Sequence, residues 1–287
     1  MPIANIASGV NLYYEETGMG ERRILFVHGI LGDYRTWKSQ VEALAANSSN
    51  YKMISVSRRS SFPNNNASIE STIQSNANDL YSLVQSLNIE KLDLVGHSFG
   101  GFVSLYFVSR HPEIVRSLVL LEPAVPSILV ENEGNPLQVL GLLLSNPSAA
   151  SSARRFQSRL KPCLKAFENG DLKSAVKQFY DGIKEEDGAF ENRLSEETRG
   201  MMIQDALTVG EANTEFPIFS KNDARTVGVP TLLVKGEKSP RWLTAIVDSL
   251  GKLMPNSRVV EIANSGHFIQ IEQPSALNEE LIKFLSS

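Results

Sequence analysis

Short apolar runs alternate with amphipathic stretches along most of the chain. The runs occupy residues 24–27, 53–56, 92–95, 118–121, 231–234 and 258–262. Runs of this length between polar turns are typical of buried parallel strands. Between them, apolar residues recur every three or four positions, which predicts helices over 37–46, 69–87, 99–110 and 241–253. This alternation predicts an α/β fold with a mostly parallel, doubly wound sheet.

The two ends of the chain have patterns of their own. Residues 3–7, a turn at Ser8-Gly9 and residues 10–15 alternate as a β-hairpin does, so we expect an antiparallel start. A helix over 275–285 is predicted directly after Pro274, because proline is well tolerated at a helix start.

The alternation stops between Pro123 and Pro217. No convincing strand occurs there, and helical patterns cover 136–144, 152–168, 172–184 and 196–209. We therefore expect a helical insertion over 123–217 that divides a core formed by 1–122 and 218–287. Two roles remain open: a surface subdomain that stabilises the sheet edge, or a cap over an active site.

The strongest local motif is G-H-S-F-G-G at residues 96–101, which lies between a predicted strand and a predicted helix. Glycines two positions either side of a serine permit a sharp strand-to-helix turn that exposes its hydroxyl. Ser98 is therefore the predicted nucleophile. Its position at a helix N-terminus makes the Phe99 N–H a candidate oxyanion donor. The alternative is an ordinary N-cap serine in a tight turn, and His97 is expected to shape that turn.

Two further loops supply complementary groups. His28-Gly29-Ile30 follows the predicted central strand 24–27, at the strand end where open α/β sheets meet ligands. The Ile30 N–H is the expected second oxyanion donor, with His28 structural. His267 lies on a small-residue loop after the last predicted strand, and a neutral imidazole there could accept the proton of Ser98.

Composition restricts the class of partner. The chain of 287 residues is 42% hydrophobic and 21% charged, which is ordinary for a soluble globular protein. A net charge of −4 without a basic stripe argues against nucleic acid or a membrane as partner and favours a small-molecule substrate. No export signal is visible, and the single cysteine, Cys163, is compatible with a reducing compartment, so we expect a cytoplasmic protein. Oligomeric state is not readable.

The order and spacing of His28-Gly29, the 96–101 motif and Gly266-His267 resemble the α/β-hydrolase superfamily across the whole chain. The resemblance implies an eight-stranded, mostly parallel sheet with helices on both faces and the first hairpin at one edge. It also implies a helical lid inserted after the sixth strand, which residues 123–217 would fit. The chain order of the catalytic groups would be nucleophile, acid, histidine.

The acid departs from the usual pattern of the superfamily. Relatives most often carry an aspartate after the seventh strand, where this chain has Ser239. Some haloalkane dehalogenases and lactone hydrolases carry the acid after the sixth strand instead, and Glu122 follows the predicted strand 118–121. We therefore predict Glu122 as the triad acid. Glu237 and the absence of a functional acid remain alternatives, and Glu122 could instead bind cap backbone.

A second departure follows the strand 53–56, where relatives often carry an aspartate and a Gly-x-Gly-x-Ser loop. This chain has Ser57, Arg58 and Arg59 there. Either arginine could face a substrate carboxylate, but a solvated or ion-paired arginine is the more common case.

These features predict a serine hydrolase that cleaves an ester, thioester or lactone through an acyl-enzyme and requires no metal or organic cofactor. A serine at 98 in place of an aspartate excludes the usual epoxide hydrolase or dehalogenase. Carbon–carbon bond hydrolases, cofactor-free haloperoxidases and acyltransferases remain alternatives, as does a non-catalytic ligand-binding protein, because Ser239 carries no charge. An acyl pocket could form from apolar residues of the insertion, which are Leu140, Leu143, Leu144, Phe156, Phe179 and Phe190.

Overall fold

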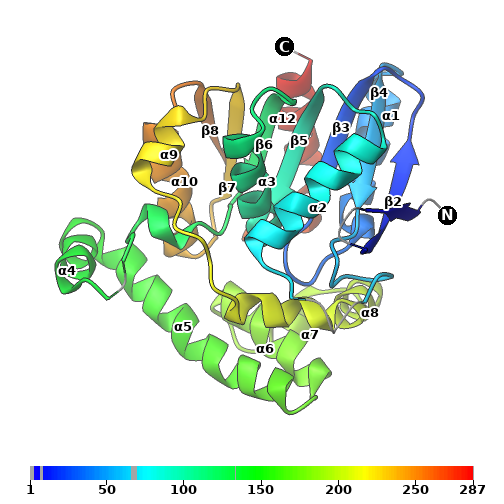
Figure 1. Ribbon diagram of the computed structural model, residues 1–287. Helices are drawn as coiled ribbons and strands as arrows, with labels where there is room; N and C mark the ends of the chain where they lie inside the picture. Colours follow the sequence, from blue (N-terminus) through cyan, green and yellow to red (C-terminus); the bar gives the residue numbers. More distant parts are fainter. Residues whose placement is uncertain (1–2, 7–8, 66–69, 133, 287) are drawn as a thin grey trace.

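A computed structural model describes residues 3–6, 9–65, 70–132 and 134–286 (Figure 1). It contains one eight-stranded sheet of order β1-β2-β4-β3-β5-β6-β7-β8. Strands β1 and β2 are antiparallel to their neighbours and the other pairs are parallel, which confirms the predicted fold class. Residues 7 and 8 of the predicted hairpin lie outside the described residues. The strands are β1 Ile3–Asn5, β2 Asn11–Thr17, β3 Arg22–Val27, β4 Tyr51–Val56, β5 Leu92–His97, β6 Val115–Leu121, β7 Thr231–Gly236 and β8 Ser257–Ile262.

Helices cover both faces of the sheet, and the strands bury alternate residues against each face. In β3, Leu25 and Val27 pack in one hydrophobic cluster, while Ile24 and Phe26 pack in the other. This alternation is what the pleat of a strand requires. Helices α2 and α3 lie in front of the sheet in Figure 1, and α1 and α12 lie behind it. The α-helices of the core are α1 Lys38–Asn47, α2 Ile73–Ser86, α3 Ser98–Arg110, α9 Lys221–Thr226, α10 Arg241–Leu253, α11 Ile269–Glu272 and α12 Pro274–Leu285.

The predicted helices of the core agree with these bounds within about two residues, except at the start of α2. Residue 69, where that helix was expected to begin, lies outside the described residues, and the described helix begins at Ile73. Thr72 caps it by accepting the Ser75 N–H, and a capping side chain of this kind sets where a helix starts.

Residues 123–217, which we call the inserted segment, connect β6 to β7 and lie beyond the carboxyl ends of the parallel strands (Figure 1). Its described residues form helices without a strand. The predicted helix over 196–209 is wrong at its end, because α8 stops at Gln204 and a 3-10 helix, η3, follows Asp205. The helices are η2 Pro126–Ile128, α4 Pro136–Ser145, α5 Pro147–Glu168, α6 Leu172–Lys184, α7 Ala189–Arg193, α8 Glu196–Gln204 and η3 Ala206–Asn213.

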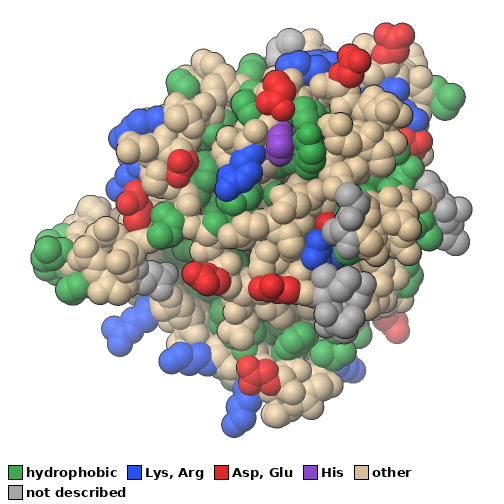
Figure 2. Space-filling model, viewed as in Figure 1, with side chains coloured by type: hydrophobic (Ala, Val, Ile, Leu, Met, Phe, Trp, Pro, Cys, Tyr) green, Lys and Arg blue, Asp and Glu red, His purple; other side chains and the backbone are tan. Residues whose placement is uncertain are grey.

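Helix α4 is the most exposed apolar element of the inserted segment. None of its residues is buried, and Leu137 and Leu144 are each 76% exposed. Hydrophobic side chains gather over α4 at the left edge of Figure 2. None of the described helices combines the length and the apolar character needed to span a bilayer.

The inserted segment is joined to the core at a buried pair of carboxyl groups. Asp33 begins the 3-10 helix η1, Tyr34–Trp37, and forms an ion pair with Arg35. Asp205 faces this pair from the inserted segment and accepts the Phe62 N–H at 2.8 Å. Burial, and then the nearby charge of Asp33, raise the pKa of Asp205 to about 9. Asp205 is therefore protonated at neutral pH in the folded protein.

This raised pKa predicts a pH-dependent contribution to stability. Between about pH 4 and pH 9 the folded chain keeps a proton on Asp205 that the unfolded chain has lost, so this contribution to stability falls as pH rises. Asp205→Asn removes the titration and keeps an acceptor for Phe62. Urea unfolding should therefore show that the variant gains free energy of unfolding relative to the wild type between pH 5.5 and pH 9.

The exposed carboxylate of Asp171, which caps α6, provides a control. Asp171→Asn should change stability by the same amount at both pH values. An equally constant difference for Asp205→Asn would show that Asp205 does not hold a proton in the folded state.

Candidate active site

Ser98 lies in a tight turn between β5 and α3. Its backbone φ is +54°, a left-handed conformation that a serine adopts only where its surroundings impose it. A Cβ atom at Gly100 would clash with the carbonyls of Val27 and His28, and one at Gly96 would clash with Ser104. The two glycines of the motif are therefore required for close packing, and the turn holds Ser98 beyond the end of the sheet.

Three predicted site residues form one chain of hydrogen bonds. His267 Nε2 lies 2.9 Å from Ser98 Oγ, and His267 Nδ1 lies 2.7 Å from Glu122 Oε2. Because a carboxylate only accepts, Nδ1–H donates to Glu122, and Nε2 is left to accept the hydroxyl proton of Ser98. The other Glu122 oxygen accepts the Gly236 N–H at 2.8 Å. The structure thus brings together side chains from the ends of β5 and β6 and from the loop after β8.

The alternative acid does not contact the imidazole. Glu237 is exposed and accepts the Asn264 N–H at 2.8 Å. Ser239 is buried, and its hydroxyl has no partner among the described residues. Of the acids considered from the sequence, Glu122 is the one that hydrogen-bonds to His267.

Glu122 occupies an unusual backbone position. It follows the last residue of β6 with φ +41°, and its N–H donates to the Val234 carbonyl of β7 at 3.0 Å. Ser98, Leu31 and Asn264 also have positive φ and lie in the loops at this end of the sheet. Non-glycine residues in this conformation store strain and concentrate at functional sites.

The loop that carries His267 is held by neighbours from three elements. His97 Nε2 lies 2.9 Å from the His267 carbonyl, so His97 contacts this loop as well as shaping the turn. Burial, and then His267, lower the pKa of His97 well below its ordinary value and keep it neutral. Glu272 accepts the Gly266 N–H and pairs with Lys184 of α6, both within 2.8 Å. No sequence motif indicated Glu272 or Lys184, because their contact depends on the packing of the inserted segment.

The two predicted oxyanion donors come from the residue after Ser98 and from the loop that packs beside it. Phe99 N–H belongs to the first turn of α3, where backbone donors have no partner within the helix. Ile30 N–H has no acceptor among the described residues, and a Cβ at Gly29 would lie 2.9 Å from that of Ser98. Both residues line the same cavity as Ser98 and His267.

That cavity has a volume of about 820 Å³ and separates the core from the inserted segment. Most of its lining is apolar, and Phe156 stacks on Trp242 with ring centroids 5.3 Å apart. Of the pocket residues expected from the sequence, Leu143, Phe156 and Phe179 line the cavity. The expectation is wrong for the other three: Leu140 and Leu144 are exposed on α4, and Phe190 is buried against Tyr180.

Both arginines after β4 are ion-paired, one of the two cases that the sequence favoured, and both are buried rather than solvated. Arg58 pairs with Glu211 at 2.5 Å and Arg59 with Asp79 at 2.7 Å. Neither side chain lines the cavity, so neither is placed to meet a substrate carboxylate. Among the described residues, no group of histidine, cysteine, aspartate and glutamate side chains is arranged to hold a metal ion.

Comparison with known proteins identifies the family. The family described as "alpha/beta hydrolase fold" matches residues 22–274. A Bacillus subtilis (strain 168) protein named "Uncharacterized carboxylesterase nap" is 26% identical over 92% of this chain and 79% of its own. "Epoxide hydrolase 3" of Xenopus tropicalis is 26% identical over 97% of this chain and 75% of its own. The solved structure of an esterase from Exiguobacterium antarcticum superposes with a TM-score of 0.76 at 17% identity, covering 99% of both chains.

The geometry predicts that Glu122 controls the reactivity of Ser98. Glu122→Gln keeps the size of the side chain but cannot stabilise an imidazolium ion at His267. The rate at which a fluorophosphonate labels Ser98 should fall by on the order of 100-fold or more. Intact-protein mass spectrometry measures this rate, and Glu237→Gln serves as the matched control with an unchanged rate. Equal rates for the two variants would refute the role of Glu122.

Proposed function

The chain belongs to the alpha/beta hydrolase fold family and is a hydrolase, and we propose that it cleaves a small carboxylic ester, thioester or lactone through an acyl-enzyme on Ser98. The observation that carries this proposal is the Ser98–His267–Glu122 chain of hydrogen bonds at the edge of an apolar cavity. A serine activated by a neutral imidazole is a nucleophile for carbonyl carbon.

In the acylation step, Ser98 Oγ attacks the substrate carbonyl while His267 Nε2 takes the hydroxyl proton. Glu122 stabilises the imidazolium that forms, as its 2.7 Å contact with Nδ1 allows. The Ile30 and Phe99 N–H groups receive the negative charge that develops on the carbonyl oxygen. His267 then returns the proton to the leaving alcohol, thiol or ring oxygen, and the acyl group stays on Ser98.

In the second step, His267 takes a proton from water, and the resulting hydroxide attacks the acyl carbonyl. The tetrahedral intermediate uses the same two N–H donors, and its collapse returns the proton to Ser98 Oγ and releases the acid. We propose that residues 123–217 act as a lid during this cycle, because they close one side of the cavity over Ser98 and His267.

The cavity indicates the kind of acyl group. At about 820 Å³ it lies in the upper part of the range of ligand pockets and exceeds the needs of an acetyl group. Most of the lining side chains, such as Phe179 and Phe216, are apolar, which favours an aliphatic or aromatic acyl group. The alternative of a non-catalytic binding protein depended on Ser239 at the usual acid position, and the contact between Glu122 and His267 argues against it.

A panel of p-nitrophenyl esters tests the activity and the pocket together. Each buried methylene contributes about 0.8 kcal/mol, so kcat/KM should rise by on the order of 100-fold from the acetyl to the hexanoyl ester. Ser98→Ala should abolish turnover while keeping the thermal unfolding midpoint.

A panel of lactones with matched alkyl chains determines which class of carbonyl substrate the enzyme prefers. The proposal would be refuted if a fluorophosphonate labels Ser98 but the protein hydrolyses no member of either panel. Activity that is unchanged in Ser98→Ala would refute it as well.

A further inference from the structure

A buried cation donates a hydrogen bond to the carbonyl oxygen of the peptide bond between Gly29 and Ile30. Arg58 Nη2 donates to the Gly29 carbonyl at 3.1 Å, and Arg58 Nε donates to the His28 carbonyl at 3.0 Å. The C=O and N–H of a trans peptide point in opposite directions across one rigid plane. A donor that fixes the Gly29 oxygen therefore also fixes the direction of the Ile30 N–H, on the opposite side of the peptide.

His28 holds the same carbonyl from a second direction. Its Nδ1 lies 2.9 Å from the Gly29 oxygen, and its Nε2 lies 3.0 Å from the Arg58 backbone N–H. Only the neutral tautomer with hydrogen on Nδ1 satisfies both contacts. Burial, and then the charge of Arg58, lower the pKa of His28 well below its ordinary value, which keeps the ring neutral. The imidazole predicted to be merely structural thus helps to orient the Ile30 donor.

Arg58 also contacts the other predicted donor residue. Its guanidinium carbon lies 4.7 Å from the centre of the Phe99 ring. One cation therefore contacts the ring of Phe99 and the carbonyl of the peptide that carries the Ile30 N–H. The positively charged guanidinium that donates to the Gly29 oxygen also polarises that peptide and makes the Ile30 N–H a stronger donor.

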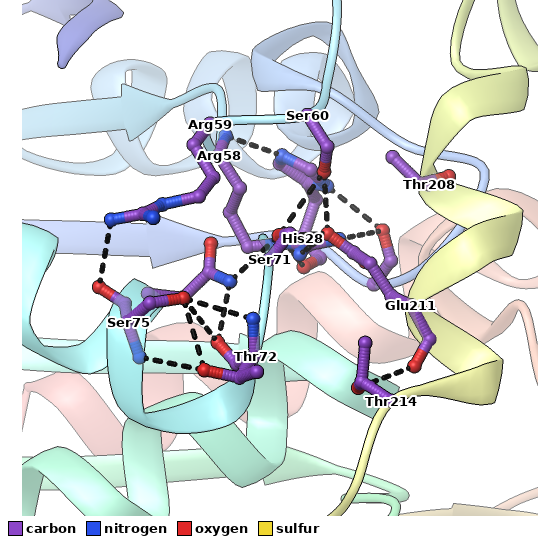
Figure 3. A network of polar contacts seen from close by, with 12 residues as sticks. His28, Arg58, Arg59, Ser60, Ser71, Thr72, Ser75, Thr208, Glu211 and Thr214 are labelled. Carbon is purple, nitrogen blue, oxygen red and sulfur yellow. Dashed lines mark hydrogen bonds and ion pairs between the residues drawn. The ribbon is translucent and has the colours of Figure 1, made fainter. Parts of the chain in front are cut away.

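The charge of Arg58 is balanced by the inserted segment. Glu211 of η3 accepts Arg58 Nη1 and Ser60 Oγ at 2.5 Å each, and it accepts Ser71 Oγ at 2.6 Å (Figure 3). Arg58 and Glu211 are each 2% exposed, so each charge depends on the other for its compensation. Figure 3 shows η3 presenting Glu211 toward the loop of Arg58 and Ser60.

A second residue of η3 contacts the loop of residues 28–32 after β3, which carries the Ile30 N–H and which we call the oxyanion loop. Thr208 Oγ1 accepts the Leu31 N–H at 2.9 Å, one residue beyond Ile30. Leu31 has a φ of +62°, so this bond supports a strained residue next to the donor.

We propose that Arg58 is a positioning residue that orients the Ile30 N–H for the oxyanion, and that Glu211 holds Arg58 there on behalf of the inserted segment. This inference rests on the proposed function. It gives the inserted segment a part in transition-state stabilisation besides its part in lining the cavity. Because the contact acts on the oxyanion, its loss should reduce kcat more than it raises KM.

The test removes both members of the pair, since one alone would leave an unpaired buried charge. The variant is Arg58→Met with Glu211→Leu, and the matched control is Arg59→Met with Asp79→Leu. The control deletes the neighbouring buried pair, whose arginine instead contacts the Glu70 and Ser75 carbonyls. Thermal unfolding shows that both variants are folded before kinetics are measured.

Three quantities are compared: kcat for the best ester of the panel, and the affinities for a ketone and an alcohol of the same chain length. The value of kcat should fall about 10- to 100-fold in the Arg58/Glu211 variant, below the about 100- to 1000-fold typical of deleting a donor outright. Affinity for a trifluoromethyl ketone of the same chain, whose adduct with Ser98 carries an oxyanion, should fall by the same factor. Affinity for the corresponding unreactive alcohol should not change, and the control should match the wild type in all three.

Glu211→Gln isolates the share of the inserted segment. This variant keeps the Arg58 donors but weakens the hydrogen bond that anchors them, so kcat and ketone affinity should fall together by a smaller factor, about 3- to 10-fold. An unchanged kcat in Glu211→Gln would overturn the part assigned to the inserted segment.

The outcomes separate the two proposals. A wild-type protein that hydrolyses no ester or lactone would refute the proposed function itself. An active wild type together with an Arg58/Glu211 variant that keeps kcat within about 3-fold would refute the inference alone. Equal losses of affinity for the ketone and the alcohol would also refute it, because they would show a deformed cavity without a specific effect on the oxyanion.

Discussion

The burial of the Glu122 carboxylate is the constraint on which the arrangement of the site depends. A carboxylate with no exposed surface must have both oxygens satisfied, because an unpaired buried charge costs several kcal/mol. Its two partners lie at one end of the sheet: the His267 Nδ1–H comes from the loop after β8, and the Gly236 N–H from the last residue of β7. Satisfying Glu122 therefore fixes β6, β7 and the loop after β8 relative to one another. The same bond turns His267 Nε2 toward Ser98.

The inserted segment and the core meet through polar contacts at the loops that carry the candidate catalytic groups. Asp205 accepts the Phe62 N–H, Glu211 pairs with Arg58, and Lys184 pairs with Glu272 beside Gly266. An apolar contact surface would allow the two parts to slide, whereas hydrogen bonds and ion pairs require one register. The segment that lines the cavity is thus also attached to the oxyanion loop and to the histidine loop.

The local features of the candidate site follow from rules that act over a few residues, whereas the choice between its alternatives depends on distant contacts. Ser98 between Gly96 and Gly100 was recognisable because a sharp turn needs glycine at fixed offsets, a rule that acts over a few residues. Glu122 and Glu237 were both plausible acids, because position in the sequence does not determine which side chain points toward His267. The errors concerned Leu140, Leu144 and Phe190, whose burial depends on how the helices of the inserted segment pack, and the end of α8, where Asp205 turns into the core.

By itself, the sequence determined the alternation of strands and helices, the mostly parallel sheet, the insertion between β6 and β7, and the turn at Ser98. These follow from periodicity and from backbone sterics, which operate between near neighbours. The tertiary structure alone decided that Glu122 bonds to His267 and that Arg58 lies behind the Gly29 carbonyl opposite Glu211. The residues that meet there are up to 153 positions apart, and only strand order and helix packing bring them within hydrogen-bond distance.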